Sequence, residues 1–224
     1  MLHTAISKNL ANIKEQITQS CEKNHRSPKD VQLIAVSKFH PVPAMEAALQ
    51  AGQRIFGENY VQEAEEKSTF LRPKYPEIKI HLIGPLQTNK AVTACKFADA
   101  IHTLDRPSLC QALQKASDKT GNLPDLFVQV NIGQEINKSG IPLEKADTFI
   151  EEALLSFGDK IKGLMCIPPQ GKPALPYFQK LAEISKKHGL KELSMGMSAD
   201  FEEAIKAGAT YVRIGTAIFG GRPV

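Results

Sequence analysis

The sequence has no tryptophan, and its four cysteines lie far apart without a C-x-x-C pair. Isolated cysteines predict neither a disulfide framework nor a zinc site, and the six histidines lack the close spacing of metal ligands. No apolar run approaches the ~18 residues that a membrane helix needs. The first residues also lack the apolar core of a signal peptide. We therefore expect a cytoplasmic protein without a metal or a membrane segment.

An excess of charge of one sign is also missing. The 224 residues carry 28 Lys and Arg against 24 Asp and Glu, which gives a formal net charge of +4. Nucleic-acid-binding domains usually present a basic face or stripe, so this scattered charge argues against a nucleic-acid partner. With 42% hydrophobic residues, the composition is that of an ordinary globular protein. The length is sufficient to bury the core of one domain.

The pattern that the chain does contain is a regular alternation of strands and helices. Seven short apolar runs are each followed by a helical pattern, and an eighth is followed by a brief apolar turn. The runs are residues 31–37, 54–58, 78–84, 100–104, 126–132, 161–167, 192–198 and 210–215. Such alternation predicts an α/β protein with a parallel sheet. Eight repeats favour a single (β/α)8 TIM-type barrel, and an open doubly wound sheet is the alternative.

The first 25 residues form an additional element. Ile6, Leu10, Ile13 and Ile17 recur at steps of four and three residues, which predicts an amphipathic helix that covers the outside or one end of the barrel. No linker or change of composition divides the chain. We therefore expect one domain over residues 1–224, with the N-terminal helix in 1–25 and the barrel in 31–222.

Functional residues of such a barrel are expected at the carboxyl ends of its strands. Lys38 follows the first apolar run, where burial would lower the pKa of its amine and let it form a Schiff base. A lysine that merely extends into solvent fits the same position.

The last two loops, SMGMSAD and RIGTAIFGG, combine glycines with the hydroxyls of Ser198 and Thr216. Helices that start after Ser198 and Thr216 would direct free N–H groups at a phosphate. An ordinary helix cap at Ser198 and a tight turn at Gly215 are the alternatives. Together with Lys38, these loops indicate either a phosphosugar aldehyde or ketone, or pyridoxal 5′-phosphate (PLP).

Seven segments of the chain resemble, in order, the pyridoxal phosphate homeostasis proteins, a family of PLP-binding barrels related to the N-terminal domain of alanine racemase. The segments are AVSKFHP, FGENYVQE, HLIGPLQTNK, KSGI, GLMCIP, LSMGMSADFEEAI and VRIGTAIFG, and the resemblance runs from about residue 31 to 222. It implies PLP fold type III and an internal aldimine between Lys38 and PLP. It further implies that the phosphate is held by Ser198, Gly215 and Thr216, that Arg213 faces the pyridine nitrogen, and that Asn59 and Met165 lie near the ring.

The arginine has a consequence for the chemistry. A guanidinium stays charged, so Arg213 would disfavour protonation of the pyridine nitrogen, and an unprotonated ring is a poor electron sink. Alanine racemase-like enzymes also carry a C-terminal β domain and a tyrosine base from the partner subunit. Here the chain stops soon after the last run, and of its four tyrosines only Tyr60 lies near the carboxyl end of a strand, where it begins a helix.

The resemblance therefore implies a protein that binds PLP and buffers or delivers it, maintaining vitamin B6 homeostasis without established catalysis. A PLP-dependent racemase or another amino-acid-transforming enzyme that uses Lys38 is the alternative. The recipients of a carrier would be PLP-dependent apo-enzymes. We expect a monomer, because the missing domain removes the dimer interface of the racemases.

Three further interpretations remain at this stage. Lys138, in NKSGI, is a candidate to receive PLP transiently, although a solvent-exposed loop lysine is the commoner case. A Schiff-base aldolase would need an acid or base beside Lys38, and Glu58 is the only nearby acidic candidate. A pure interaction module would leave the coincidence of Lys38 with two phosphate-type loops unexplained. We interpret His40 and His102 as structural, and His81, in the H-x-I-G motif of the family, as structural or peripheral to the ring.

Overall fold

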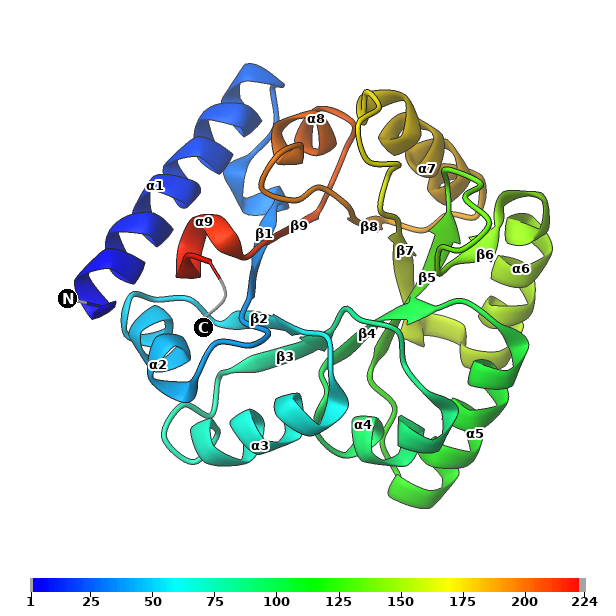
Figure 1. Ribbon diagram of the computed structural model, residues 1–224. Helices are drawn as coiled ribbons and strands as arrows, with labels where there is room; N and C mark the ends of the chain where they lie inside the picture. Colours follow the sequence, from blue (N-terminus) through cyan, green and yellow to red (C-terminus); the bar gives the residue numbers. More distant parts are fainter. Residues whose placement is uncertain (1, 222–224) are drawn as a thin grey trace.

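Eight parallel strands close into a barrel in the computed structural model, which describes residues 2–221 (Figure 1). Residue 222, the expected end of the barrel, lies outside the described residues, as do residues 1, 223 and 224. The strand order is β4-β3-β2-β1-β9-β8-β7-β5, and pairing of β4 with β5 completes the ring. The strands are β1 (Gln32–Val36), β2 (Ile55–Glu58), β3 (Lys79–Leu82), β4 (Ala100–Leu104), β5 (Asp125–Asn131), β7 (Ile161–Met165), β8 (Glu192–Ser194) and β9 (Tyr211–Ile214). Each of the eight apolar runs coincides with one of them to within one residue at its start, so the predicted barrel is confirmed.

The helices cover the outside of this ring. They are α2 (Val42–Gln50), α3 (Val61–Leu71), α4 (Ala91–Phe97), α5 (Pro107–Thr120), α6 (Ala146–Phe157), α7 (Leu175–Lys187), α8 (Phe201–Lys206) and α9 (Thr216–Phe219). After the run 126–132, the helical pattern that contains Pro142 predicts a helix that opens near this proline. The helix begins only at Ala146, because residues 141–142 form a short strand, β6 (Ile141–Pro142), and residues 143–145 form a 3-10 turn. Ile141 pairs there with Val130 of β5.

The N-terminal helix completes the outer layer. α1 (Leu2–Lys23) buries the four isoleucine and leucine side chains whose spacing predicted it. It packs against α2, α8 and α9, on the outer surface of the barrel (Figure 1). The side-chain amide of Asn9 donates a hydrogen bond to the backbone oxygen of Ile218 at 2.9 Å. Because α9 has only four residues, α1 occupies the place that a longer last helix would fill.

The buried residues form two layers. A large apolar cluster fills the space between the strands and the helices. Inside the ring, a small cluster of Ala100, Phe127 and Met165 packs against Tyr211. Buried polar side chains occur on β3, β4, β8 and β9, among them His81, His102, Ser194 and Arg213. This barrel therefore has a partly polar interior, which carries the site described below.

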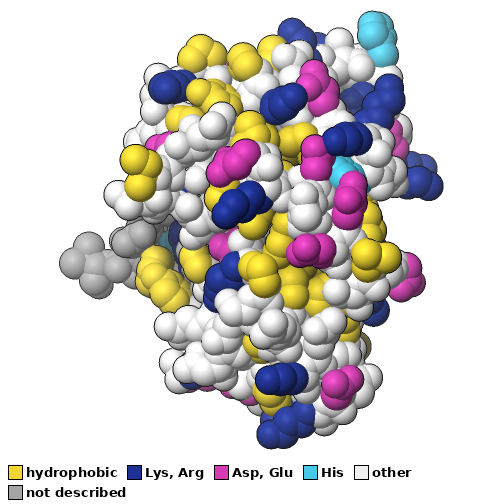
Figure 2. Space-filling view, turned by 90° about the vertical axis from the view of Figure 1, so that its right-hand side faces the viewer, with side chains coloured by type: hydrophobic (Ala, Val, Ile, Leu, Met, Phe, Trp, Pro, Cys, Tyr) yellow, Lys and Arg dark blue, Asp and Glu magenta, His cyan; other side chains and the backbone are white. Residues whose placement is uncertain are grey.

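Charges of both signs mix on the outer surface. Figure 2 shows the side of the barrel that carries α5, α6 and α7, where basic and acidic side chains are interspersed. Lys187 of α7 and Asp147 of α6, for example, form an ion pair at 2.6 Å. Within residues 2–221, no helix has the combination of length and apolar character that is needed to cross a membrane.

Candidate functional site

The strand order places the residues predicted for the site along one continuous part of the barrel rim. They come from β2, β1, β9, β8 and β7, which are neighbours in that order. Lys38 is half-buried in a turn two residues after β1, and Asn59 is half-buried directly after β2. Ser198 and Thr216 are exposed in the neighbouring loops after β8 and β9. Met165, the last residue of β7, is fully buried in the cluster inside the barrel.

Close backbone contacts join these loops. The position of a Cβ on Gly215 would lie 3.1 Å from the backbone oxygen of Val36, so the chain after β9 runs against the end of β1, two residues before Lys38. The backbone N–H of Arg213 donates to the oxygen of Gly196 at 2.9 Å, which joins β9 to the loop after β8. The amine of Lys38 and the two glycine-containing loops are thus carried by adjoining parts of one rim.

The two loops differ in how their helices start. α9 begins at Thr216 with Gly215 as its N-cap, and the first N–H groups of a helix have no acceptor within that helix. α8 begins at Phe201, three residues after Ser198, so the expected helix start next to Ser198 is wrong. Residues 198–200 form a turn instead, in which the Met197 N–H donates to Asp200 Oδ1 at 2.6 Å. Ser198 is therefore not a helix cap, and its hydroxyl belongs to an exposed turn.

Arg213 is buried inside the barrel without a carboxylate partner among the ion pairs of residues 2–221. Its Nη1 donates to Ser194 Oγ at 2.8 Å, and its Nη2 donates to the backbone oxygen of Cys166 at 3.0 Å. Only 5% of the residue is exposed. Burial lowers the pKa of Arg213, yet a guanidinium remains charged. A buried cation held only by neutral oxygens leaves donors available for a further electron-rich group.

A chain of hydrogen bonds continues from Arg213 through the barrel. Ser194 Oγ lies 2.9 Å from His102 Nδ1, and His102 Nε2 lies 2.9 Å from His81 Nδ1. Burial lowers the pKa of His81 to about 3 and that of His102 well below its usual value, so both rings are neutral. A guanidinium has no acceptor, so in the contact between Arg213 and Ser194 the arginine is the donor. The assignment of protons that also uses the hydroxyl has Ser194 donating to His102 and His102 donating to His81.

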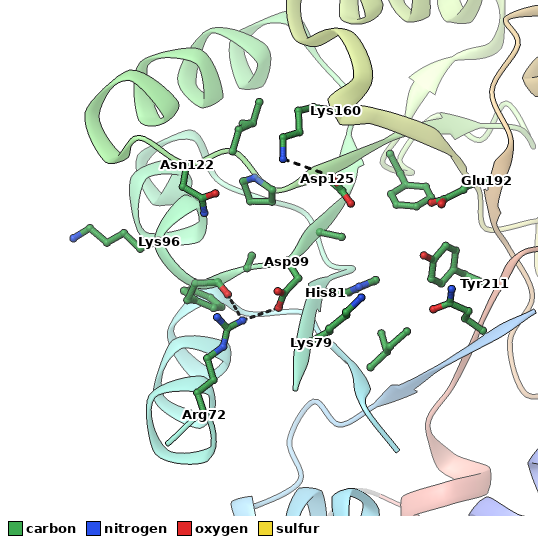
Figure 3. A pocket seen from close by; sticks show the side chains of 18 residues that line it. Arg72, Lys79, His81, Lys96, Asp99, Asn122, Asp125, Lys160, Glu192 and Tyr211 are labelled. Atoms are coloured by element: carbon green, nitrogen blue, oxygen red, sulfur yellow. Dashed lines mark hydrogen bonds and ion pairs between the residues drawn. The ribbon is translucent and has the colours of Figure 1, made fainter. Parts of the chain in front are cut away.

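A polar cavity of ≈330 Å³ lies at the opposite end of the barrel, where the strands begin (Figure 3). His81 and Tyr211 line it from inside, and Arg72 and Asp99 form an ion pair at 2.6 Å on its rim. Burial raises the pKa of Tyr211 to about 12. The chain of hydrogen bonds from Arg213 to His81 therefore ends at the cavity where the strands begin. Among residues 2–221, no three His, Cys, Asp or Glu side chains are grouped to hold a metal ion.

The sequence analysis missed the connection between these polar residues. His102 was interpreted as structural and His81 as structural or peripheral to the ring, and Ser194 was not considered. These residues share only an inward-facing position on their strands. To recognise that position, one must know the register of the strands in the barrel. Glu58 was considered as an acid or base next to Lys38, but it accepts hydrogen bonds from Ser37 and Lys67. Lys138 is exposed in the loop after β5.

The neutral histidines predict a pH dependence of stability. Both have a lower pKa in the folded protein than the ~6.5 of an unfolded chain, so the unfolded state binds more protons below about pH 6.5. The free energy of unfolding should therefore fall as the pH drops from about 6.5 towards 3, by up to about 1.4 kcal/mol per pH unit for each ring. Burial raises the pKa of Glu58 and Glu192, which opposes this loss at the acidic end.

Urea unfolding at several pH values between 5 and 7.5 measures this slope. His81→Gln keeps a hydrogen-bonding side chain that does not titrate, and it should flatten the slope by the contribution of one histidine. His3→Gln is the control, because His3 is exposed on α1. An unchanged slope in the His81→Gln protein would contradict the assignment of a neutral buried ring.

Comparisons with known proteins give a consistent result. The family model of the alanine racemase N-terminal domain matches residues 5–223. A pyridoxal phosphate homeostasis protein of Vibrio cholerae is 41% identical over 230 residues, which cover 97% of each chain. The protein of the same name from Escherichia coli strain K12 is 39% identical over 228 residues, again 97% of each chain.

Solved structures include similar barrels at two levels of identity. PipY of Synechococcus elongatus, determined with PLP bound, is 37% identical with a TM-score of 0.82, and the match covers 96% of this chain and 100% of PipY. Alanine racemase of Streptomyces coelicolor is 17% identical with a TM-score of 0.69, over 99% of this chain and 59% of the racemase. The likeness to the racemase concerns the fold alone.

Proposed function

Since the chain belongs to the pyridoxal phosphate homeostasis protein family and carries the barrel of the alanine racemase N-terminal domain, we propose that it binds PLP and serves PLP homeostasis. The relatives carry that name over nearly their full length, and PipY has been determined with PLP bound. The observation that carries the proposal for this chain is the placement of Lys38 on the same rim as the two glycine-containing loops.

The donor set around Arg213 supports the fit of PLP. Two of the five N–H donors of its guanidinium bond to Ser194 and Cys166, and no carboxylate among residues 2–221 forms an ion pair with it. A pyridine nitrogen is an acceptor that suits a buried, permanently charged donor. Arg213 would bind this nitrogen in its unprotonated form, and the hydrogen-bond chain through Ser194 would hold the guanidinium in place.

Lys38 is the residue that we propose binds PLP covalently. The aldehyde of PLP supplies an electrophilic carbon to which the neutral amine of Lys38 adds, so that a C=N bond of a Schiff base forms and the aldehyde oxygen leaves as water. An ammonium form of Lys38 must first lose one proton.

The remaining predicted residues have separate roles in this proposal. The backbone at Gly215, the start of α9 at Thr216 and the exposed hydroxyl of Ser198 would bind the phosphate. Asn59 would contact the ring from the end of β2. Met165 would support it from inside the barrel, where it is buried. The chain would act as one domain over residues 1–224.

We propose further that the protein buffers or delivers PLP and does not transform amino acids. The resemblance supports this, because a racemase needs a second base. Tyr211 lies at the first position of β9, next to the cavity at the far end of the barrel. Tyr60 is 54% exposed and is the N-cap residue of α3. In this proposal the protein is a monomeric, cytoplasmic carrier that passes PLP to apo-enzymes. The competing function is that of a PLP-dependent racemase.

Reduction with borohydride tests the proposal. The protein is incubated with PLP, reduced, digested and mapped by mass spectrometry, and the modification is expected on the peptide that contains Lys38. The unreduced complex is then mixed with L- and D-amino acids and sampled for racemised or altered products. Modification of Lys38 without turnover supports a carrier, turnover supports the racemase, and the absence of any modified lysine would rule out covalent PLP binding.

A further inference from the structure

Two buried charged side chains, Glu58 and Lys67, and the partly exposed Glu63 lie next to the Lys38 turn and have no role in the proposed function. Lys67 Nζ lies 2.8 Å from Glu58 Oε1 and 2.6 Å from Glu63 Oε1. Glu58 ends β2 and is completely buried, whereas Glu63 and Lys67 lie one turn apart on α3. One ammonium thus connects two carboxylates from different elements. We call these residues the Glu58–Lys67–Glu63 network.

The network holds the backbone on both sides of Lys38. Before Lys38, the oxygen of Ser37 accepts a hydrogen bond from Lys67 Nζ at 2.8 Å, and the Ser37 hydroxyl donates to Glu58 Oε1 at 2.7 Å. After Lys38, the N–H of Phe39 donates to Glu63 Oε1 at 2.7 Å. The two peptide neighbours of the lysine are therefore tied to the same buried ion cluster.

This arrangement costs stability. Removing ions from water costs several kcal/mol for each ion, and apolar residues in their place are often as stable or more stable. Glu58 Oε2 has no hydrogen-bond partner among the described residues, and burial raises the pKa of Glu58 although Lys67 favours its ionised form. Phe39 also has a φ of +66°, in the left-handed region that non-glycine residues rarely adopt. Such a conformation persists where surrounding contacts enforce it.

We propose that the Glu58–Lys67–Glu63 network positions the amine of Lys38 for attachment to PLP, an inference that rests on the proposed function. Fixing Ser37 and Phe39 limits the space that the lysine side chain searches. A reacting amine held close to its partner reacts faster, and a misplacement of about 1 Å can cost about a hundredfold in rate. In this proposal the three residues act through Lys38 and do not themselves contact PLP.

Hydrogen exchange tests the hold on the backbone without any cofactor. Glu63→Ala removes the acceptor of the Phe39 N–H, and exchange of the amides in residues 37–40 should accelerate by about tenfold or more. Glu63→Gln keeps an oxygen acceptor and should restore most of the protection. Glu63 is a quarter exposed, so both variants are expected to fold. Equal exchange in the Glu63→Ala and wild-type proteins would overturn the proposal.

The rate of PLP attachment tests the effect on Lys38. Lys67→Met keeps the length of the side chain but removes the ammonium, and at saturating PLP it should slow covalent attachment by about tenfold or more. Arg72→Met is the matched control. Arg72 follows the last residue of α3 and binds Asp99 at the opposite end of the barrel, so its loss breaks an ion pair, although a more exposed one, away from Lys38. Attachment in the control should stay within about twofold of wild type.

The outcomes separate positioning from general stability. If Lys67→Met and Arg72→Met lower the melting temperature alike but only Lys67→Met slows attachment, the network positions Lys38. If both variants attach PLP at the wild-type rate, its role is purely structural and the proposal is overturned. If the wild-type protein fails to attach PLP at Lys38, the proposed function falls, and the exchange experiment on Glu63→Ala still decides whether the network holds this turn.

Discussion

Replacement of Lys38 by alanine is expected to reduce borohydride trapping of PLP to background. The methyl group of alanine cannot form the C=N bond, and Lys138 is proposed only to receive PLP transiently. Non-covalent binding should survive at reduced affinity, because Arg213 and the loops after β8 and β9 remain. Mass spectrometry after reduction measures the covalent part, and equilibrium dialysis measures the total.

Lys90→Ala is the matched control for this experiment. Lys90 is half-buried like Lys38 and lies in the loop after β3, on the same rim of the barrel. The control should be modified at Lys38 to the same extent as the wild-type protein. Stoichiometric modification of another lysine in the Lys38→Ala protein would show that the attachment site is wrong, while leaving PLP binding itself intact.

The largest loss of stability is expected from Gly163→Ala. The position of a Cβ on Gly163 lies 1.8 Å from the backbone oxygen of Glu192 and 2.5 Å from its carbonyl carbon. Gly163 pairs directly with Glu192 in the parallel ladder between β7 and β8. Because both obstructing atoms belong to the backbone, the strands must separate to admit a methyl group. We expect the free energy of unfolding to fall by roughly 3–5 kcal/mol.

Urea denaturation compares this variant with Gly221→Ala. Gly221 is exposed, and an added Cβ there meets nothing within 4 Å, so the control should remain within about 0.5 kcal/mol of wild type. A Gly163→Ala protein as stable as the control would mean that β7 and β8 approach each other less closely than described. The visible spectrum with PLP should follow the fraction of folded protein in both variants.

The barrel could be predicted because its strands are marked individually in the sequence. Each apolar run is long enough and sufficiently separated from the next to be recognised without knowing its neighbours. β6 could not be predicted in this way, since two residues form a strand only because the loop after β5 returns to Val130. For the same reason, the start of α6 at Ala146 could not be predicted.

The site could be predicted only in part, for a related reason. Lys38, Ser198 and Thr216 are conspicuous where they stand in the chain, directly after apolar runs. The hydrogen-bond chain that starts at Arg213 is different, because two of its members, Ser194 and His102, are 92 residues apart and meet only through the closure of the ring. The Glu58–Lys67–Glu63 network was missed although it is local, because the sequence does not tell which side of β2 faces α3.

The place of α1 in the outer layer has a consequence for how the chain acquires its structure. Among the described residues α1 precedes every other helix, yet it packs against α8 and α9 near the other end of the described chain, and Gln32 of β1 pairs with Tyr211 of β9. On the ribosome, α1 and β1 must therefore wait for almost the whole chain before they meet these neighbours. Contacts of such long sequence separation slow folding, since their loop-closure entropy is lost before they form. Completion of the ring and attachment of α1 should consequently be late events in folding.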